Sequence, residues 1–479
     1  MKIAIAASEA APYIKTGGLG DVMHALPQSL SRIAKNEVTL VLPYYGAIKY
    51  GGQWQTEFLG SFDVPLAWRQ EYVGVFRLKS RKKKLQVYFI DNEHYFCRDG
   101  IYGQNDDGER FAYFSKAVLA ALKFLDFTPD VVHCNDWQTA LIPLLLKTEY
   151  RQTFPNVKSI FTIHNIEYQG KCGLDFNRDV LGLPGECDAV LRFEDSTNFL
   201  KAAIVCADKI STVSETYAKE LRYAYYAHGM HELLCSRSAD FVGITNGIDM
   251  ELFDPQKSCG VAQFYGEKTI TEGKAANKRA LQKALGLPED PEVAVLAVVS
   301  RLAEHKGFDL LSYISERLMQ RRMQLVILGT GEEKYEWFFS GLAYRFPSCC
   351  AAYLQFDAKL ANLVYAGSDI FLMPSKNEPC GLSQLIAMRF GTVPVVNATG
   401  GLHDTVWPYD ETNETGRGFT FQSYNADDFL AAIDRSLKLF YEQSEKWKRL
   451  AQNDMRIDSS WTLPAAKYMT LYQNTIKES

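Results

Sequence analysis

The sequence lacks several features that would place it outside the ordinary globular enzymes. No run of about 18 or more apolar residues occurs, so no segment is long enough to cross a membrane as a helix. The ten cysteines are scattered and form no Cys-x-x-Cys pair, which argues against a disulfide scaffold. The apolar run at residues 1–7 is short and is followed at once by Ser8 and Glu9, unlike a secretory signal. These absences predict a reduced, cytoplasmic protein, although a mature plastid form would look the same.

An excess of one charge is also missing. The formal net charge is -5 and the pI is about 6.0, which argues against a nucleic-acid binder and gives no support for attraction to anionic membranes. The sequence contains no internal repeat and no low-complexity tract. Its 479 residues exceed the size that one core fills, about 250–300 residues, so we expect two large domains.

Short apolar runs alternate with amphipathic stretches, and this rhythm predicts parallel sheets covered by helices. In the first half, buried strands are expected at residues 3–7, 38–42, 131–133 and 159–163, and helices at residues 22–34, 110–125 and 137–149. The rhythm restarts with strands at residues 293–299, 325–328, 369–373 and 393–396, a helix at 308–319 and an amphipathic C-terminal stretch at 461–476. The polar segment 256–283 is interpreted as part of the connection between the halves.

The predicted fold class is therefore α/β, with two Rossmann-like, doubly wound domains that face each other across a cleft. The N-terminal domain is expected at residues 1–245, with residues 457–479 returning to it as a C-terminal helix. The second domain is expected at residues 249–456.

One segment breaks the rhythm. Residues 72–78 and 85–90 alternate like strands, and four basic residues, Arg81 to Lys84, stand between them. We expect an antiparallel hairpin with a basic turn. The charges could form a patch for an anionic partner, but a solvated turn is favoured because charge at a sheet edge opposes aggregation.

The first candidate motif is the loop at residues 15–21, with the sequence KTGGLGD. Adjacent glycines allow the backbone to approach a ligand closely, and the helix expected next directs its N–H groups toward the same place. Lys15 adds a mobile positive charge. The competing interpretation is a tight turn in which Asp21 caps the helix. The loop is not a P-loop, because no Gly-Lys-Ser/Thr follows at the required spacing.

The second half carries a pair of cations at the end of its first strand, in residues 300–307. Arg301 and Lys306 flank a turn there, and two fixed cations would offset the charge of a departing nucleoside diphosphate without a metal ion. An exposed surface pair is the alternative.

A third cluster spans residues 374–384. Pro379 ends extended structure, and Gly381 allows a tight turn into a helix expected at 385–390. The backbone N–H groups of residues 381–383 would face the interdomain space, and Glu378 could accept hydrogen bonds from sugar hydroxyls. A second Gly-Gly turn follows at residues 399–405.

Together these motifs resemble those of bacterial glycogen synthases and plant starch synthases, which are retaining glycosyltransferases of the two-Rossmann-domain (GT-B) type. The resemblance covers nearly the whole chain, and the Lys-Thr-Gly-Gly-Leu loop is specific to this family among its GT-B relatives. The matching segments are residues 15–21, 133–139, 164–170, 212–214, 246–249, 300–307, 378–384 and 400–405.

The resemblance implies transfer of glucose from ADP-glucose to the non-reducing end of an α-1,4-glucan, glycogen or malto-oligosaccharide, with no cofactor or metal and no nucleic-acid or membrane partner. The catalytic group it implies is Glu378, His164, Arg301, Lys306, Lys15 and Asp136. The donor-binding group it implies is Lys15, Gly17, Gly18, Asn246, Arg301, Lys306, Phe356, Cys380, Gly381, Leu382 and Ser383. The acceptor-side group it implies is Glu9, Asp21, Tyr95 and Asp136.

Several of these residues have competing structural interpretations. Asp136 could be the N-cap of the helix expected at 137–149, and Cys380 is favoured as a backbone contact over a nucleophile. His133, at the end of an expected strand, is interpreted as structural. His228 and His231 could share a helix face, but without a third ligand they make a weak metal site. The aromatic stretch 223–226 is interpreted as packing in preference to polymer binding.

Two positions depart from the patterns of relatives. Many retaining GT-B enzymes carry a second Glu where this chain has Ile386, which argues against trehalose-, sucrose- or mannosyl-type relatives. Gly20 stands where many relatives carry Ala, a difference expected to be harmless.

Three other functions are compatible with parts of the sequence. The first is a GT-B transferase that uses UDP-glucose or another acceptor, and the second, from a different class, is a glucan-binding protein with an inactive site. Glycogen phosphorylase shares the two-domain plan but is much longer and needs a lysine-bound pyridoxal phosphate.

Overall fold

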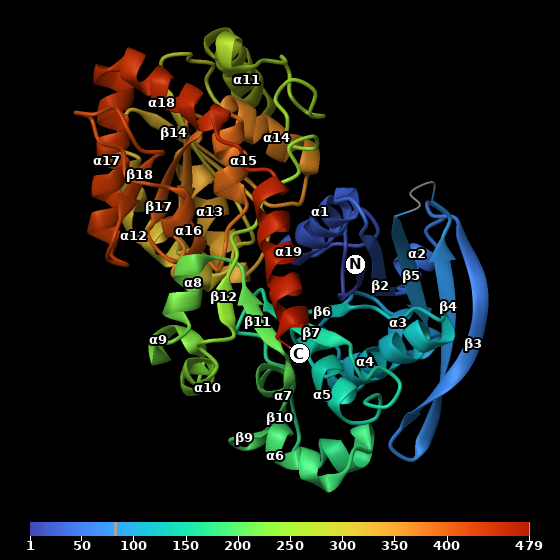
Figure 1. Cartoon of the computed structure of the whole chain (residues 1–479). Helices are drawn as coiled ribbons and strands as arrows, with labels where there is room; N and C mark the ends of the chain where they lie inside the picture. Colours follow the sequence, from blue (N-terminus) through green and yellow to red (C-terminus); the bar gives the residue numbers. More distant parts are fainter. Residues whose placement is uncertain (81–83, 479) are drawn as a thin grey trace. The chain divides into compact units, whose positions relative to one another are not determined.

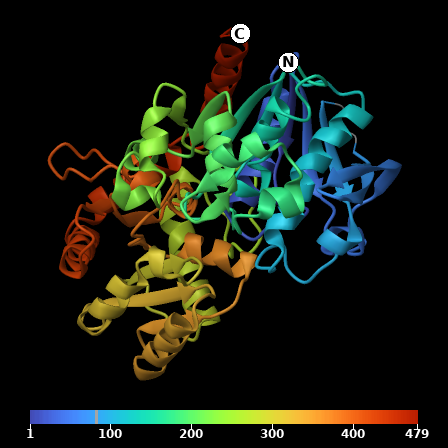
Figure 2. The same cartoon turned by 90° about the horizontal axis from the view of Figure 1, so that it is seen from below.

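The computed structural model describes residues 1–80 and 84–478. The chain forms two compact units, Met1–Asn246 with Trp461–Ser479 and Gly247–Ser460, and both termini belong to the first (Figures 1 and 2). Three basic residues of the expected hairpin turn, Arg81, Lys82 and Lys83, lie outside the described residues. No helix in the described part of the chain is long and apolar enough to cross a membrane.

The first unit is built on a nine-stranded sheet in the order β12-β11-β7-β6-β1-β2-β5-β4-β3. All neighbours are parallel except the β3/β4 and β4/β5 pairs, so the expected hairpin is confirmed and gains β3 as an edge strand. The strands are β1 (Lys2–Ala6), β2 (Glu37–Pro43), β3 (Thr56–Leu66), β4 (Arg69–Leu78), β5 (Leu85–Asp91), β6 (Val131–Asn135), β7 (Lys158–Ile163), β11 (Lys209–Thr212) and β12 (Phe241–Gly243). The strand order reverses between β1 and β6, where ligands bind in open α/β sheets.

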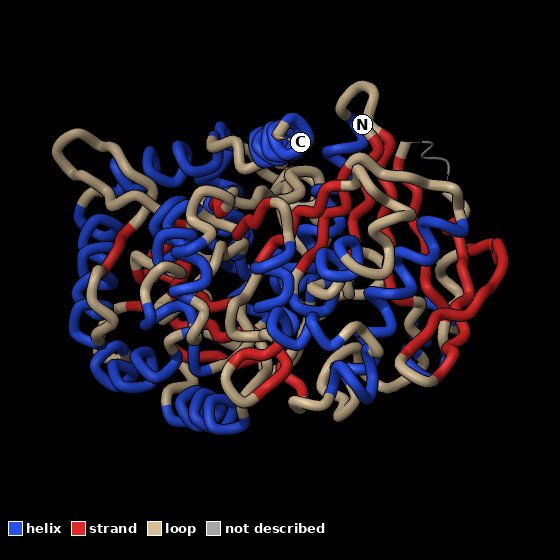
Figure 3. The backbone as a smooth tube through the Cα atoms, turned by 60° about the horizontal axis from the view of Figure 1, so that its bottom comes forward, coloured by secondary structure: helices blue, strands red, loops and turns tan. Residues whose placement is uncertain are grey.

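Helices cover the faces of this sheet, as Figure 3 shows for the blue and red segments. They are α1 (Gly18–Arg32), α2 (Gly46–Lys49), α3 (Glu93–Phe96), α4 (Asp107–Phe124), α5 (Ile142–Lys147), α6 (Asp188–Leu191), α7 (Phe199–Cys206), α8 (Glu215–Glu220), α9 (Ala224–Ala227), α10 (His231–Ser236) and α19 (Thr462–Lys477), with the short turns η1 (Trp137–Thr139), η2 (Asn177–Leu181) and η3 (Gly185–Cys187). A small separate sheet joins β8 (Lys171–Cys172), β10 (Ser196–Asn198) and β9 (Arg192–Phe193).

The C-terminal helix α19 packs on the first unit, as expected, and lies beside α1 and β7 (Figure 1). The Tyr472 hydroxyl lies 2.7 Å from Nδ1 of His133, and Lys467 pairs with Glu215 at 2.8 Å. The segment therefore completes the first unit although it follows the second in sequence.

The second unit is built on a six-stranded, wholly parallel sheet in the order β15-β14-β13-β16-β17-β18. Its strands are β13 (Ala294–Val299), β14 (Met323–Leu328), β15 (Cys350–Tyr353), β16 (Ile370–Met373), β17 (Val393–Asn397) and β18 (Phe419–Phe421). Counted along the chain, this is the 3-2-1-4-5-6 order of the Rossmann fold, with its reversal between β13 and β16.

The core of the second unit lies between this sheet and the helices around it. The helices are α11 (Ile270–Ala284), α12 (Phe308–Leu318), α13 (Glu333–Arg345), α14 (Ala358–Gly367), α15 (Ser383–Arg389), α16 (Gly400–Thr405), α17 (Ala426–Glu442) and α18 (Ser444–Arg456), with the turns η4 (Glu267–Thr269) and η5 (Glu304–Lys306).

Three expected boundaries are wrong. Helix α1 begins at Gly18, four residues before the predicted start, because glycine is typical of loops and hides the start of the helix in the sequence. The predicted helix 137–149 is interrupted, since η1 ends at Thr139 and α5 begins at Ile142. Strand β6 runs to Asn135, which places His133 in the middle of the strand and not at its end.

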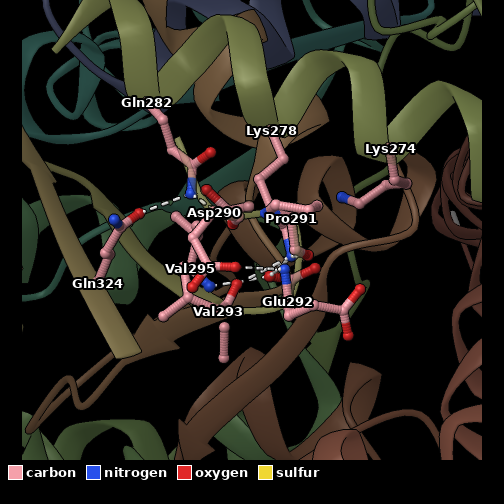
Figure 4. Close-up of polar contacts among 12 residues, drawn as sticks. Lys274, Lys278, Gln282, Asp290, Pro291, Glu292, Val293, Val295 and Gln324 are labelled. Atoms are coloured by element: carbon pink, nitrogen blue, oxygen red, sulfur yellow. Dashed lines mark hydrogen bonds and ion pairs between the residues drawn. The ribbon is translucent and has the colours of Figure 1, made fainter. Parts of the chain in front are cut away.

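The interpretation of 256–283 as a connection is also wrong, because α11 is a 15-residue helix packed on α14. Half of its six buried residues are polar, Asn277, Lys278 and Gln282, so its hydropathy resembles that of a linker. Lys278 pairs with Asp369 at 2.8 Å. Gln282 donates to Gln324 Oε1 at 2.8 Å, as Figure 4 shows. These bonds compensate for the cost of burying polar side chains.

Candidate active site

The loop after β1 is held in place by Glu9. One carboxylate oxygen accepts from the Thr16 backbone N–H at 2.6 Å and its hydroxyl at 2.8 Å, and the other accepts from Gly20 N–H at 3.2 Å. Burial raises the pKa of Glu9 above its ordinary value, and the hydrogen bonds from this loop oppose that shift. Glu9 therefore shapes the glycine loop, with Gly17 extended at its end and Gly18 opening α1.

Lys15 forms an ion pair with Asp21, with Nζ 2.6 Å from Oδ2. The capping interpretation of Asp21 is wrong, because Gly17 is the N-cap of α1 and Asp21 lies within the first turn. A Cβ on Gly20 would lie 2.8 Å from Cγ of Lys15, so an alanine there requires the lysine to move. The expectation that Gly20 in place of Ala is harmless stays a prediction.

Asp136 follows β6, on the other side of the reversal point. Its Oδ1 accepts from the backbone N–H groups of His164 at 2.7 Å and Asn165 at 3.3 Å, which fixes the loop after β7. Asp136 occupies the N-cap position of η1, as the N-cap interpretation expected, but its side chain makes no capping bond there. Burial raises the pKa of Asp136 to about 7, although the two N–H donors favour its ionised form.

His164 stands at the start of that loop with its ring orientation defined. Its Nε2 lies 3.0 Å from Oδ1 of Asn135, and the Asn135 amide nitrogen donates to Ala6 O at 3.1 Å. The Asn135 oxygen therefore faces the ring as an acceptor, which assigns the proton to Nε2 and leaves a lone pair on Nδ1. Burial lowers the pKa of His164 to about 3, so the imidazole is neutral and Nδ1 can accept a hydroxyl hydrogen.

The two remaining sugar-side candidates of the first unit differ. Asn246 is buried, and its Oδ1 has no hydrogen-bond partner among the described residues. Tyr95 is buried against other aromatic rings, and its hydroxyl donates to Glu109 at 2.7 Å. In the part of the chain that the structure describes, Tyr95 makes no bond to Glu9, Asp21 or Asp136, so the structure does not bring it to the other acceptor-side candidates.

The remaining histidines are not organised as a metal site. His133 is fully buried between Thr162 and Tyr472, and burial lowers its pKa to about 3, which agrees with its structural interpretation. His228 ends α9 and His231 begins α10, so the two do not share a helix. No group of three metal-ligating side chains occurs within residues 1–80 and 84–478.

The aromatic stretch after α8 does not pack as expected. Tyr223 is 66% exposed and Tyr225 is 64% exposed, and the rings of Tyr225 and Tyr226 meet edge to face with their centroids 4.8 Å apart. The packing interpretation is therefore wrong for these two side chains.

In the second unit, Lys306 and Glu378 meet across the reversal point of the sheet. Lys306 belongs to η5, in the connection after β13, and Glu378 follows β16. Lys306 Nζ lies 2.7 Å from Oε2 of Glu378, and Ser375 Oγ donates to the same oxygen at 2.9 Å. Glu378 is buried and Lys306 partly so, which means that the surface-pair interpretation does not describe Lys306.

Arg301 and Phe356 lie at the carboxyl ends of β13 and β15, the two strands that flank β14. Arg301 follows β13, is exposed, and makes no ion pair within the described chain. Phe356 follows β15 and is 84% exposed, an unusual exposure for so large an apolar ring. Both side chains are open to a ligand at this edge of the sheet.

The loop after Glu378 leads directly into α15. Gly381 has a φ of 70°, in the left-handed region, and α15 begins at Ser383, two residues before the predicted start. Cys380 is buried, whereas Leu382 and Ser383 are partly exposed. A Cβ on Gly400 would lie 2.0 Å from the carbonyl oxygen of Glu378, so the second Gly-Gly turn supports this loop by close backbone packing.

Two residues that shape these half-sites were not singled out from the sequence, Asn135 and Ser375. Each stands within a motif that the sequence did reveal, and each follows or ends an apolar strand. A polar residue at the carboxyl end of a predicted strand is the signal that could have identified them.

The fold and its two half-sites define a glycosyltransferase of the two-Rossmann-domain, GT-B type. The starch synthase catalytic domain model matches residues 2–236, and the glycosyl transferases group 1 model matches residues 277–454. This chain belongs to the glycogen synthase and starch synthase family, which confirms the resemblance drawn from its motifs.

Relatives and solved structures agree with this assignment. The glycogen synthase of Clostridium novyi is 44% identical and that of Clostridium perfringens 45% identical, over at least 99% of this chain and 99% of theirs. The catalytic domain of starch synthase IV from Arabidopsis thaliana, solved bound to ADP and acarbose, superposes with a TM-score of 0.91 at 33% identity over 99% of both chains. Sucrose-phosphate synthase from Thermosynechococcus elongatus, at 17% identity and a TM-score of 0.60, shares the fold.

Proposed function

We propose that this protein elongates an α-1,4-glucan, glycogen or malto-oligosaccharide, by transferring glucose from ADP-glucose to its non-reducing end and releasing ADP. The observation that carries the proposal is the Lys306–Glu378 pair at the reversal point of the second sheet. A cation beside a buried carboxylate suits a ligand that combines a diphosphate with a sugar. The starch synthase IV structure, bound to ADP and acarbose, supports this assignment.

In this proposal the second domain, residues 249–456, binds the donor. Arg301 and Lys306 hold the diphosphate, and Glu378 accepts hydrogen bonds from the glucose hydroxyls. The N–H groups of Gly381, Leu382 and Ser383, beyond Cys380, cradle the sugar and phosphate. Phe356 stacks on the adenine. Because two fixed cations meet the charge on the leaving ADP, we expect EDTA to leave turnover unchanged.

The first domain, residues 1–245 with 457–479, supplies the acceptor side and part of the donor site. Lys15 leaves Asp21 to reach the donor phosphate, with Gly17 and Gly18 close to it. Nδ1 of His164 accepts a hydroxyl hydrogen of the transferred glucose, and Asp136 holds His164 in place through its backbone. The unpartnered oxygen of Asn246 accepts from a further sugar hydroxyl.

We propose that the reaction retains the anomeric configuration by attack on the face from which ADP leaves. The acceptor 4-hydroxyl bonds to the anomeric carbon as the bond to the β-phosphate oxygen breaks, and that phosphate takes the hydroxyl proton. A double displacement needs a carboxylate nucleophile and a second acid beside the anomeric carbon. Many retaining GT-B enzymes carry Glu at the position of Ile386. Because isoleucine can neither attack the anomeric carbon nor take a proton, its presence here fits a reaction in which the phosphate is the base.

The test is incorporation of labelled glucose into glycogen from ADP-glucose and from UDP-glucose, measured side by side. We expect a higher kcat/KM with ADP-glucose and a product that α-amylase degrades. A preference for UDP-glucose would replace the donor assignment. Binding of glycogen without incorporation from either donor would identify an inactive glucan-binding protein.

A further inference from the structure

The connections after β13 and β14 are joined by backbone hydrogen bonds. Leu302 N–H donates to Thr330 O at 3.0 Å, and Glu332 N–H donates to Leu302 O at 2.7 Å. The strand pairing therefore continues beyond the sheet into the two loops. The loop after β14 is the platform on which the loop carrying Arg301 and Lys306 rests.

The Glu332 side chain reaches from this platform to the turn that carries Lys306. Its Oε1 accepts from the backbone N–H of Glu304 at 2.7 Å. Glu304 is the first residue of η5 and Lys306 is the last, so the bond lies at the amino end of the turn. The residue in the N-cap position is Ala303, whose side chain has no acceptor. Glu332 therefore supplies the cap that this turn cannot supply for itself.

The charge on Glu332 is stabilised where it lies. The Glu304 N–H hydrogen bond, followed by that from Lys334, lowers the pKa of Glu332 below its ordinary value. Lys334 Nζ lies 3.1 Å from Oε2 of Glu332 and 2.9 Å from Oε2 of Glu304. The carboxylate is therefore ionised at neutral pH and held toward η5.

The carboxyl end of the same turn is tied to the other side of the sheet reversal. Lys376 N–H donates to His305 O at 2.9 Å, and Lys306 Nζ contacts Glu378. The turn is thus fixed at one end by the loop after β16 and at the other by Glu332. A single turn closed by few internal bonds frays when its cap is lost, because its first N–H groups then have no partner.

We propose that Glu332 is a positioning residue for the donor diphosphate, which acts by holding the η5 turn so that Lys306 is presented to the ligand. This inference rests on the proposed donor site in the second domain. Glu332 itself is not placed in contact with the donor. Glu332 contributes by restricting the positions that the Lys306 ammonium can adopt, because this cation must meet the phosphate in one geometry.

The test is the affinity for ADP, measured by isothermal titration calorimetry on the full-length protein. We expect Glu332→Ala to raise the Kd for ADP about 3- to 10-fold, the range that loss of a helix cap supports. Glu332→Gln keeps an oxygen that can accept from Glu304 N–H, and we expect its Kd to stay within about twofold of wild type. The matched control is Glu333→Ala, which removes the same charge from the neighbouring, exposed position.

A double-mutant cycle with Lys306→Ala shows whether Glu332 acts through Lys306. If it does, Glu332→Ala has no further effect on ADP affinity once Lys306 is absent. Equal effects in both backgrounds would overturn the inference, as would a Glu332→Ala protein that binds ADP like Glu333→Ala. A Glu332→Gln protein as impaired as Glu332→Ala would also overturn it, because charge and not the hydrogen bond would then be responsible.

Thermal unfolding of each variant separates positioning from general damage. We expect Glu332→Ala and Glu333→Ala to unfold at similar temperatures while their Kd values differ. Failure of the wild-type protein to bind ADP would contradict the proposed function, an outcome distinct from any difference among the variants.

Discussion

Nζ of Lys15 lies 2.6 Å from Oδ2 of Asp21, so the ammonium proposed to meet the donor phosphate is bound to a carboxylate of its own loop. The two side chains are 38% and 25% exposed. A partly exposed pair of this kind contributes about 0–1 kcal/mol, which a diphosphate can replace with a stronger interaction. The pair therefore holds Lys15 without preventing its transfer to a ligand.

Replacing Lys15 by Gln should impair use of the donor without unfolding the protein. We expect kcat/KM for ADP-glucose to fall about 10- to 1000-fold, the loss typical of removing one charged contact to a developing anion. The melting temperature should stay unchanged, because Lys15 is partly exposed. Lys219→Gln, at an exposed position on α8, is the control. Turnover near wild type for Lys15→Gln would show that the lysine does not reach the phosphate.

Substituting Gly20 by Ala should displace Lys15 without removing its charge. The new Cβ would lie 2.8 Å from Cγ of Lys15, so the lysine must adopt another rotamer. We expect a rise in the KM for ADP-glucose that is smaller than that of Lys15→Gln. If the substitution has no effect in the Lys15→Gln background but an effect in wild type, it acts through the lysine. Unchanged kinetics in wild type would show that the lysine relaxes without cost.

Glu378→Ala should reduce turnover by about 100- to 10,000-fold. It removes the carboxylate proposed to accept hydrogen bonds from the glucose hydroxyls, and it leaves Lys306 without its ion-pair partner. Glu378→Gln keeps two hydrogen-bonding atoms and should retain more activity. Both rates are read from incorporation of labelled glucose into glycogen, with ADP affinity measured on the same preparations. Loss of less than about tenfold in Glu378→Ala would remove this residue from the catalytic group.

The pKa of Asp136 predicts a pH dependence of stability. Burial raises it to about 7, whereas an aspartate in the unfolded chain titrates near about 3.9. Between these values the folded protein binds more protons than the unfolded chain, so the free energy of unfolding falls as pH rises from about 4 to 7. Asp136→Asn removes this contribution. Across that pH range, we expect its free energy of unfolding to rise by about 1–3 kcal/mol relative to that of wild type. If urea unfolding gives the same difference in free energy of unfolding between wild type and Asp136→Asn at every pH, the assignment is contradicted.

Lys274 lies on α11 (Figure 4). It predicts a pH dependence of stability of the opposite sign. Burial lowers its pKa to about 7, although Nζ donates to Thr392 Oγ1 at 2.6 Å. The unfolded chain then binds more protons between about pH 7 and 10.4, so the free energy of unfolding rises with pH in that range. Lys274→Met should flatten this rise, by an amount on the order of a few kcal/mol. If the free energy of unfolding, measured in urea, rises equally with pH for wild type and Lys274→Met, Lys274 is not desolvated.

Much of the fold could be predicted from the sequence, because the buried strands are short apolar runs bounded by glycine and polar residues. The starts of helices were harder to predict from the sequence. Helix α1 begins among glycines, and α11 buries Lys278 and Gln282, so neither shows the expected change in hydropathy. The position of α11 depends on polar contacts with residues distant in the chain, Asp369 and Gln324.

The family and the residue types of the two half-sites follow from the sequence alone, because loop motifs such as residues 15–21 and 378–384 express local backbone and charge requirements. How those residues are used depends on the folded structure. It directed Glu9 to its own loop, paired Lys15 with Asp21, and assigned the His164 proton to Nε2 through Asn135. Burial and hydrogen-bond partners determine which of these side chains are protonated and which can bind a ligand. Both come from residues that are brought together only when the chain folds.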